Sequence, residues 1–390
     1  MNARITNTFP FNTKLGYYIP DSVKAKVYSV LTPDSILTKS FNYRIRVTLS
    51  QIPDYKYLGY GGALVKSSDE VIYISNEGEV NVLKIEAGSV SVSHRKGKLP
   101  GWVSVRDAAM TLDQFLYIYG VVEVENGCGS VRISRYPMVA NKPISVKEED
   151  IVWTSEANCK YEPKTAGGRI IISGDSLFVS TGIFQSPINS GIIPENWSQK
   201  PTSSWGKILR IRDGQATVWA SGFRNPQGLF VGQRGIFATD HGPSGGDEVN
   251  KIKRGGNYGW PCKTYGRLYS AELNVEKDYP LPTDIQGCDQ ADSYQPPLYA
   301  FSRPSLGVSQ GLEYLNGEEF PNFNGSFLVS SLKGKSIFRF MLNEDQSRVL
   351  SIDEINIGVR MRDILQLDNG KILIFSDKGY FGLLTKADAD

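Results

Sequence analysis

The 390-residue sequence has little histidine, little excess charge and no long apolar run. It contains 2 His, and 43 Lys and Arg against 41 Asp and Glu give a formal net charge of +2. Such a balance argues against a nucleic-acid-binding surface, which usually needs a stripe of positive charge. No run of about 18 apolar residues occurs, so the sequence predicts no membrane-spanning helix.

Helical periodicity is also missing. No window keeps apolar residues at positions i, i+3, i+4 and i+7 over four turns. The chain instead contains 39 Gly, 20 Pro, 20 Tyr and 17 Phe. Turn-forming and aromatic residues favour many short strands joined by tight turns. We therefore expect an all-β fold, and 40% hydrophobic residues are enough to bury its core.

Cysteine is scarce, and its spacing excludes the common zinc and redox motifs, because no C-x-x-C pair is present. The four residues are Cys128, Cys159, Cys262 and Cys288. Proximity in the sequence favours disulfides Cys128–Cys159 and Cys262–Cys288, and four buried free thiols are the alternative. Disulfides would indicate a periplasmic or secreted protein. The first residues, MNARITNTFPF, lack the apolar segment of a signal peptide.

One short pattern recurs six times along the chain: a polar turn, about four apolar residues, and then Ser, Thr or Gly. The copies are DEVIYIS (69–75), DQFLYIY (113–119), DSLFVSTG (175–182), RGIFATDHG (234–242), GSFLVSSLKG (325–334) and GKILIFSDKG (370–379). Several copies are followed by a second alternating strand, which is typical of a hairpin.

This repeat predicts a six-bladed β-propeller with one unit per blade and with loop insertions on one face. A blade cannot bury both of its faces alone, so neighbouring blades must cover each other. We expect a single propeller domain over residues 1–390, with residues 1–45 carrying the weakest signal. A large β-sandwich is the alternative.

Candidate binding residues are densest between residues 221 and 262. Arg224, Asn225 and Gln227 surround a proline, and a guanidinium with two amides can recognise a planar anionic ligand. Gly242 and Pro243 follow a predicted strand, and their backbone carbonyls can face a hard cation such as Ca²⁺. A cluster of purely structural turns is the alternative.

The string GFRNPQGL…DHGPSGGDEVN…GGNYGWP, within residues 222–261, resembles the soluble quinoprotein sugar dehydrogenases, the glucose/sorbosone dehydrogenase family. The resemblance extends from about Tyr60, through Gly167-Gly-Arg-Ile and Trp205-GKILRI, to Arg360-MRDILQLDNGKILIFSD. It implies a six-bladed propeller that uses pyrroloquinoline quinone (PQQ) and Ca²⁺. It also implies oxidation of an aldose or related alcohol by hydride transfer to the quinone.

The resemblance further implies roles for particular residues. Those expected to contact the quinone are Arg224, Asn225, Gln227, Lys333, Arg360 and Arg362. The residues expected to hold calcium through backbone oxygens are Gly242 and Pro243 at the cofactor, and Glu248 and Tyr258 at a second site. Several cations at one opening suit PQQ, which carries three carboxylates. Arg224 is in addition expected to stabilise developing negative charge. For Lys333, Arg360 and Arg362 taken singly, a solvated loop is the alternative.

One departure affects the expected chemistry. The family places a histidine, the general base, shortly before its Gly-Gly-Arg segment, and this position is Thr165 here. Threonine has no pKa near neutrality and cannot replace imidazole. Lys164 or Glu162 could act as a base if burial shifted its pKa. Of the two histidines, His94 is expected at an exposed blade edge, and His241 belongs to the DHGP segment.

Three hypotheses follow from the sequence. The first is a PQQ-dependent sugar dehydrogenase with altered or impaired base chemistry. The second is a non-catalytic propeller that binds a ligand. The third is a different enzyme that uses the basic opening for another anionic substrate. The expected partner is a small sugar or other polar substrate, and the electron acceptor is unspecified.

Overall fold

The computed structural model describes residues 35–53, 55, 61–68, 70–86, 88–139, 142–159, 167–183, 196–266, 268–269, 276–277, 288, 293–302 and 304–387. Regular structure in these residues is β-strand, apart from 3-10 helices η2 (Glu125–Gly127), η3 (Val146–Glu148), η6 (Asn196–Ser198) and η8 (Pro321–Phe323). Within the same residues, no helix has the length and hydropathy that crossing a membrane would require.

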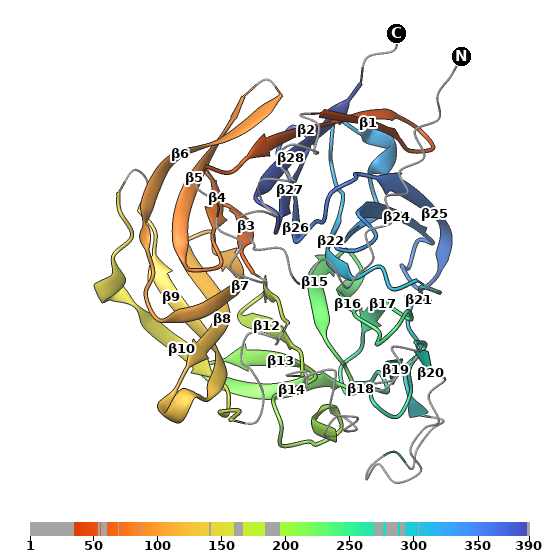
Figure 1. Ribbon diagram of the computed structural model, residues 1–390. Helices are drawn as coiled ribbons and strands as arrows, with labels where there is room; N and C mark the ends of the chain where they lie inside the picture. The colour runs from red at the N-terminus through yellow and green to blue at the C-terminus, as the bar shows by residue number, and fades with distance from the viewer. Residues whose placement is uncertain are drawn as a thin grey trace.

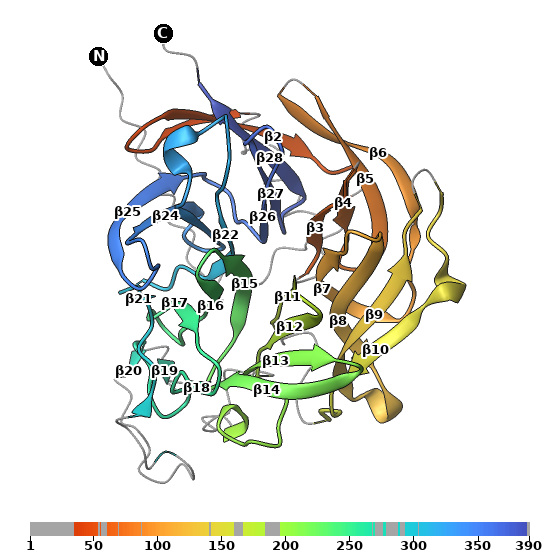
Figure 2. The same ribbon diagram turned by 180° about the vertical axis from the view of Figure 1, so that it is seen from behind.

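Six sheets surround a central axis as the blades of a propeller (Figures 1 and 2), and their strands are antiparallel except for β18, which pairs parallel with β14. Blade 1 consists of β3 (Ala63–Lys66), β4 (Val71–Ile74), β5 (Glu79–Glu86) and β6 (Ser89–Lys98). Blade 2 consists of β7 (Trp102–Met110), β8 (Phe115–Glu123), β9 (Gly129–Pro137) and β10 (Asp150–Thr154). Blade 3 consists of β11 (Ile170–Ser173), β12 (Ser176–Thr181), β13 (Lys207–Arg212), β14 (Gln215–Ser221) and the added β18 (Gly256–Asn257).

The second half of the ring follows the same plan. Blade 4 consists of β15 (Pro226–Gly232), β16 (Gly235–Asp240), β17 (Glu248–Ile252) and β21 (Tyr299–Ala300). Blade 5 consists of β22 (Val308–Glu313), β23 (Phe327–Ser331), β24 (Ser336–Leu342) and β25 (Val349–Asn356). Blade 6 consists of β26 (Asp363–Gln366), β27 (Ile372–Ser376), β28 (Tyr380–Lys386), β2 (Arg44–Gln51) and β1 (Ser35–Lys39). A small separate pair is formed by β19 (Leu268–Tyr269) and β20 (Glu276–Lys277).

Two distant parts of the chain close the ring in blade 6. Strand β2 pairs antiparallel with β28, with Thr48 opposite Leu383. Strand β1 then pairs with β2 at the outer edge of the same sheet. Blade 6 is therefore completed by strands that are more than 300 residues apart in the sequence (Figure 1).

The predicted fold class is confirmed. Each of the six predicted copies falls on the second strand of one blade, and these strands are β4, β8, β12, β16, β23 and β27. The hairpin partner expected after several copies is the third strand of the same blade. His94 lies exposed on β6, the outermost strand of blade 1, as expected.

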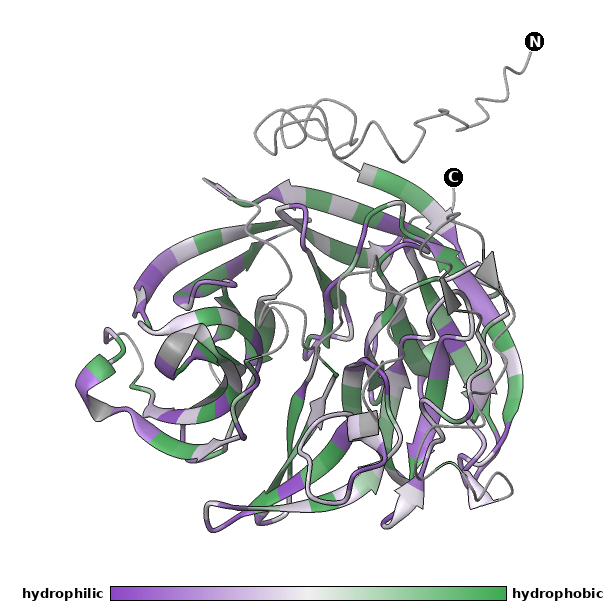
Figure 3. Cartoon of the chain, turned by 60° about the horizontal axis from the view of Figure 1, so that its bottom comes forward, coloured by the Kyte–Doolittle hydropathy of each residue, from purple (hydrophilic) through white to green (hydrophobic). Residues whose placement is uncertain are grey.

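Apolar residues pack between neighbouring blades, in one cluster per interface. Strand β12, whose six residues are all buried, illustrates the arrangement. Leu177 and Val179 join the cluster shared with blade 2, and Phe178 joins the cluster shared with blade 4. Alternate side chains of a strand point to opposite faces of the sheet. Each blade therefore buries both faces against its neighbours, and Figure 3 shows the hydrophobic positions recurring along the strands.

Both predicted disulfides are present. Cys128–Cys159 lies in blade 2 beside a bridge that pairs Gly129 with Asn158. Cys262–Cys288 ties down the insertion between β17 and β21. On the chain-entropy estimate, loops of this length stabilise the fold by about 3 kcal/mol each.

Candidate functional site

The turn that carries Arg224 and Asn225 is fixed by a buried carboxylate at the end of β16. The backbone N–H of Arg224 donates to Asp240 Oδ2 at 2.9 Å, and that of Asn225 donates to Oδ1 at 2.6 Å. Asp240 lies opposite Pro226, the first residue of β15. Burial raises the pKa of Asp240 to about 6, although the two N–H groups lower it. The turn is thus held to the neighbouring strand of its own blade.

The amides of Asn225 and Gln227 join blades 3 and 4. Asn225 Oδ1 accepts hydrogen bonds from the backbone N–H of Gly167 and from Gln227 Nε2, both at 3.1 Å. A Cβ on Gly167 would lie 2.3 Å from Asn225 Oδ1, and one on Gly182 would lie 2.6 Å from it. Glycine is therefore required at both positions for the amides to approach this closely.

Arg362 extends this network across the axis to blade 6. Its Nη1 donates to Gln227 Oε1 at 2.8 Å, and its Nη2 donates to Asp377 Oδ2 at 2.9 Å. Arg360 contacts both oxygens of the same carboxylate, each at 3.2 Å. Burial alone would raise the pKa of Asp377, but Arg362 and Arg360 together hold it below its usual value. We call Arg360, Asp377 and Arg362 the opening cluster.

Arg224 points toward the loop that follows β16. Its Nη1 donates to the carbonyl oxygens of His241 and Gly242, both at 3.2 Å, and its guanidinium lies 5.5 Å from the centre of the Trp260 ring. His241 Nε2 lies 2.6 Å from the carbonyl oxygen of Val308. Because a carbonyl only accepts, this ring nitrogen carries the proton. Burial lowers the pKa of His241 to about 4, so the ring is neutral near pH 7.

Lys333 follows β23 on the same face of the ring. Its backbone N–H donates to the carbonyl oxygen of Leu306 at 2.9 Å. The side chain is exposed, and it makes no hydrogen bond or ion pair with the residues that the structure describes. Its predicted contact with a cofactor carboxylate stays a prediction.

The predicted calcium ligands lie close to this loop. The carbonyl oxygen of Gly242 accepts from Arg224, and Pro243 is buried beside it. Burial, and then the charge of Asp240, raise the pKa of Glu248 to about 8. The Glu248 carboxylate accepts from Asn250 Nδ2 at 2.9 Å, and Asn250 Oδ1 is a buried acceptor without a hydrogen bond. A buried oxygen without a hydrogen bond, next to a buried carboxyl group, could act as a ligand for a cation.

Tyr258 has other partners. Its ring stacks on Phe223 with 4.7 Å between centroids, and its hydroxyl donates to the carbonyl oxygen of Lys251 at 2.5 Å. No group of three or more His, Cys, Asp or Glu side chains suited to a metal occurs among the described residues. The calcium binding through backbone oxygens that the sequence predicts stays a prediction.

The sequence predicts that Thr165 stands where the family has its general base. Thr165, together with Lys164 and Glu162, lies outside the described residues. Sequence reasoning also missed several residues that build the site, above all Asp240 and Asp377. Both follow the apolar residues of a repeat copy: Asp240 follows Thr239 in RGIFATDHG, and Asp377 follows Ser376 in GKILIFSDKG. An acidic residue at the end of a buried second strand was the available signal.

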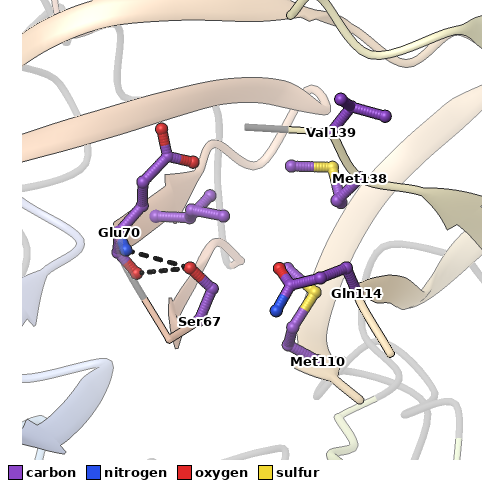
Figure 4. A pocket seen from close by; sticks show the side chains of 7 residues that line it. Ser67, Glu70, Met110, Gln114, Met138 and Val139 are labelled. Carbon is purple, nitrogen blue, oxygen red and sulfur yellow. Dashed lines mark hydrogen bonds between the residues drawn. The ribbon is translucent and has the colours of Figure 1, made fainter. Parts of the chain in front are cut away.

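The arginines, amides and carboxylates of the network lie next to the starts of innermost strands or the ends of second strands, and so on one face of the ring. A small pocket lies at the opposite ends of β3, β7 and β8 (Figure 4). Its lining includes Ser67, Glu70, Met110 and Gln114. The Ser67 hydroxyl and the backbone of Glu70 exchange hydrogen bonds at this edge. This pocket belongs to the far face and not to the candidate site.

The fold and the site together define a six-bladed propeller with a connected set of arginines and amides at one opening. Residues 54–384 match the glucose/sorbosone dehydrogenase family, and the chain belongs to that family.

Known proteins agree with this assignment. The chain is 28% identical over 245 residues to the aldose sugar dehydrogenase YliI of Escherichia coli (strain K12), covering 56% of this chain and 58% of that protein. The chain matches about half the length of each of its curated relatives.

Two solved structures share the fold. The soluble aldose sugar dehydrogenase of Escherichia coli in its apo form gives a TM-score of 0.69 at 21% identity, covering 88% of this chain and 100% of that one. The PQQ-bound aldose sugar dehydrogenase of Streptomyces coelicolor gives 0.62 at 19% identity, covering 87% and 98%.

Proposed function

We propose that this protein binds PQQ at the opening of the propeller and oxidises an aldose or a related alcohol. The observation that carries the proposal is one continuous network, in which Asn225 bonds to Gln227, Gln227 to Arg362, and Arg362 to Asp377. It joins the RNPQG turn to the VRMRD segment, which are 135 residues apart. Membership of the family and the PQQ-bound relative of the same fold support the choice of ligand.

The residues present fit a flat, triply acidic group. The opening cluster holds two guanidiniums and one carboxylate, and Arg224 adds a further cation at the loop that follows β16. Arg360, which is 25% exposed, and the exposed Lys333 would pair with carboxylates of the ligand. Asn225 and Gln227 would orient it through amide contacts. When bound, PQQ supplies a two-electron acceptor for the hydride of the substrate.

We further propose that Ca²⁺ accompanies the quinone. The carbonyl oxygens of Gly242 and Pro243 would hold it at the cofactor, and a second ion would lie near Glu248 and Tyr258. The unsatisfied Asn250 Oδ1 and the buried carboxyl of Glu248 support the second site. A chelation experiment tests both sites: EDTA should lower the melting temperature, and added Ca²⁺ should restore it. An unchanged melting temperature in EDTA would argue against both.

The main test is the addition of PQQ and Ca²⁺ to the apo-protein. Binding should stabilise the fold by about 2.7 kcal/mol at one hundred times the dissociation constant, seen as a rise in melting temperature. Dye reduction in the presence of a panel of aldoses then measures catalysis. Arg224→Ala should weaken PQQ binding, whereas Arg254→Ala, an exposed arginine beside Trp219, should not. Absence of any PQQ-dependent stabilisation would refute the cofactor assignment.

A non-catalytic ligand-binding propeller is the second candidate, because we infer from the sequence that Thr165 stands at the position of the family base. Tight PQQ binding with no dye reduction would favour it. Thr165→His separates the two cases: a gain of sugar oxidation would support an impaired dehydrogenase, since a general base contributes about 10²–10⁴ in rate. No gain, with PQQ bound as tightly as before, would favour the binding protein.

We also propose a periplasmic or secreted location. The two disulfides support it, because such bonds persist in oxidising compartments. Fractionation of the native organism, followed by thiol labelling with and without reductant, tests the location. Free thiols in freshly isolated protein would contradict it.

A further inference from the structure

Arg169 lies at the axis, where residues of five blades meet. Its side chain is 2% exposed and lies between two carboxylates, with Nη1 3.1 Å from Asp107 Oδ1 and 3.4 Å from Asp363 Oδ2. Asp107 belongs to β7 of blade 2, and Asp363 begins β26 of blade 6. We call Asp107, Arg169 and Asp363 the axial cluster.

The carboxylates of the axial cluster are themselves anchored. Asp107 Oδ2 accepts the backbone N–H of Ile170 at 2.9 Å. Asp363 Oδ2 accepts the backbone N–H of Leu64, on blade 1, at 2.7 Å. Burial alone would lower the pKa of Arg169, but Asp363 and Asp107 raise it above its usual value. The guanidinium is therefore a fixed cation in a rigid frame.

The other side of the same guanidinium holds the backbone of two candidate cofactor residues. Arg169 Nε donates to the carbonyl oxygen of Gln227 at 2.8 Å, and Nη2 donates to the carbonyl oxygen of Arg362. The side chains of Gln227 and Arg362 bond to each other at 2.8 Å. Arg169 thus fixes the main chain at both ends of this side-chain contact.

Hydrogen bonds between paired strands cannot fix the distance between Gln227 and Arg362. Gln227 belongs to blade 4 and Arg362 immediately precedes blade 6, with blade 5 between them in the ring. Ladder hydrogen bonds act within one blade, so they do not set a distance across the axis. A planar guanidinium carries its donors on three separated nitrogens and so can span such a gap, whereas an ammonium has all of its donors on one nitrogen.

We propose that Arg169 is a positioning residue, which sets the separation of Gln227 and Arg362 and thereby the width of the anion-binding opening. The identity of the anion as PQQ rests on the proposed function, but the positioning itself does not. The sequence gives Arg169 only as part of a Gly-Gly-Arg motif, with no role attached to it.

The test is Arg169→Lys with Arg339→Lys as its matched control. Arg339 is also a buried arginine: its Nε donates to Ser326 Oγ at 3.1 Å, and its Nη1 lies 3.9 Å from Asp353 Oδ2. It belongs to β24 of blade 5, where it lies over the Phe323 ring. We expect R169K to weaken PQQ binding about tenfold or more, the value of one charge-assisted hydrogen bond. R339K should lose stability but keep the wild-type dissociation constant.

A crystal structure of R169K without ligand supplies the second readout. We expect the 2.8 Å contact between Gln227 Oε1 and Arg362 Nη1 to be broken. An intact contact would overturn the positioning role, whether or not PQQ binds. Failure of wild-type protein to bind PQQ would refute the proposed function alone, because the crystal structure still decides the role of Arg169.

Should R169K not fold, Asp107→Asn takes its place with the same two readouts. This variant keeps the arginine but removes one of its carboxylate partners. Weakened PQQ binding together with a displaced Arg362 would support the proposal. Wild-type affinity together with an unmoved Arg362 would overturn it.

Discussion

The axial cluster and the opening cluster are built from the same two residue types in opposite proportions. At the axis one guanidinium lies between two carboxylates, whereas at the opening one carboxylate lies between two guanidiniums. The formal charges are therefore −1 and +1. The clusters are joined, because Arg169 donates to the carbonyl oxygen of Arg362.

Exposure separates them further. The three axial side chains are at most 4% exposed. In the opening cluster Asp377 and Arg362 are also buried, but Arg360 is 25% exposed. Buried ion pairs rarely add net stability, but removing one partner is costly. The axial cluster therefore serves to hold blades in register, and the opening cluster keeps a surplus positive charge near solvent. We therefore infer that the axial cluster has a structural role and that the opening cluster binds the anionic ligand.

The largest expected effect is that of Arg169→Met. It leaves two buried carboxylates without their cation, so we expect a loss of about 3–5 kcal/mol in the free energy of unfolding. Urea denaturation measures it. Arg135→Met, which removes a half-exposed partner of Asp150, should cost below about 1 kcal/mol. Equal losses in the free energy of unfolding of the two variants would contradict a structural role for the axial cluster.

The two clusters should also respond oppositely to pH. Burial raises the pKa of Asp107 to about 6, despite Arg169, so the folded state retains a proton that the unfolded state loses near pH 4. Its contribution to stability therefore falls, by on the order of 2 kcal/mol, as pH rises from about 4 to 6. Comparing Asp107→Asn with wild type by denaturation across this range measures the slope.

For Asp377 the sign is reversed. Its pKa is lowered in the folded state by Arg362 and Arg360, which outweigh burial. Its contribution is complete above about pH 4 and is lost as pH falls through the folded pKa. Asp377→Asn should therefore cost about 2 kcal/mol at neutral pH, with the deficit shrinking only in strong acid. A deficit that changed between pH 5 and 7 would contradict this assignment.

The smallest effect on stability is expected for Arg360→Gln. Arg362 still neutralises Asp377, so the loss should be below about 1 kcal/mol. Affinity for PQQ should nevertheless fall, and its dependence on salt should weaken, because one ion pair with a carboxylate of the ligand is removed. Titrations at low and high salt measure both. Unchanged salt dependence would place Arg360 outside the binding surface.

Much of the fold could be predicted from local pattern. The six second strands are continuous apolar segments between polar turns, and burial on both faces makes them recognisable. The pairing of β2 with β28 could not be read from the sequence, since nothing local distinguishes Arg44–Gln51 from any other alternating strand. Long-range pairing depends on ring geometry, which a linear pattern does not contain.

The candidate site divides in the same way. Arg224, Asn225 and Gln227 stand together in one motif, and a resemblance was enough to single them out. The contacts of Asp377 and of the axial cluster join blades that are far apart in the sequence. The sequence therefore could not predict that these residues lie together. One feature of the sequence did mark the axial carboxylates. Both follow an arginine directly, in SVRDAAM within β7 and in RMRDILQ at the start of β26.

The closure of blade 6 has a consequence for synthesis. Strand β2 leaves the ribosome early, but its partner β28 is made more than 300 residues later. Until then the apolar flanks of blades 5, 6 and 1 are uncovered, and the nascent chain is an open arc. A chaperone or a translocation channel has its longest opportunity to engage this protein before that final strand arrives.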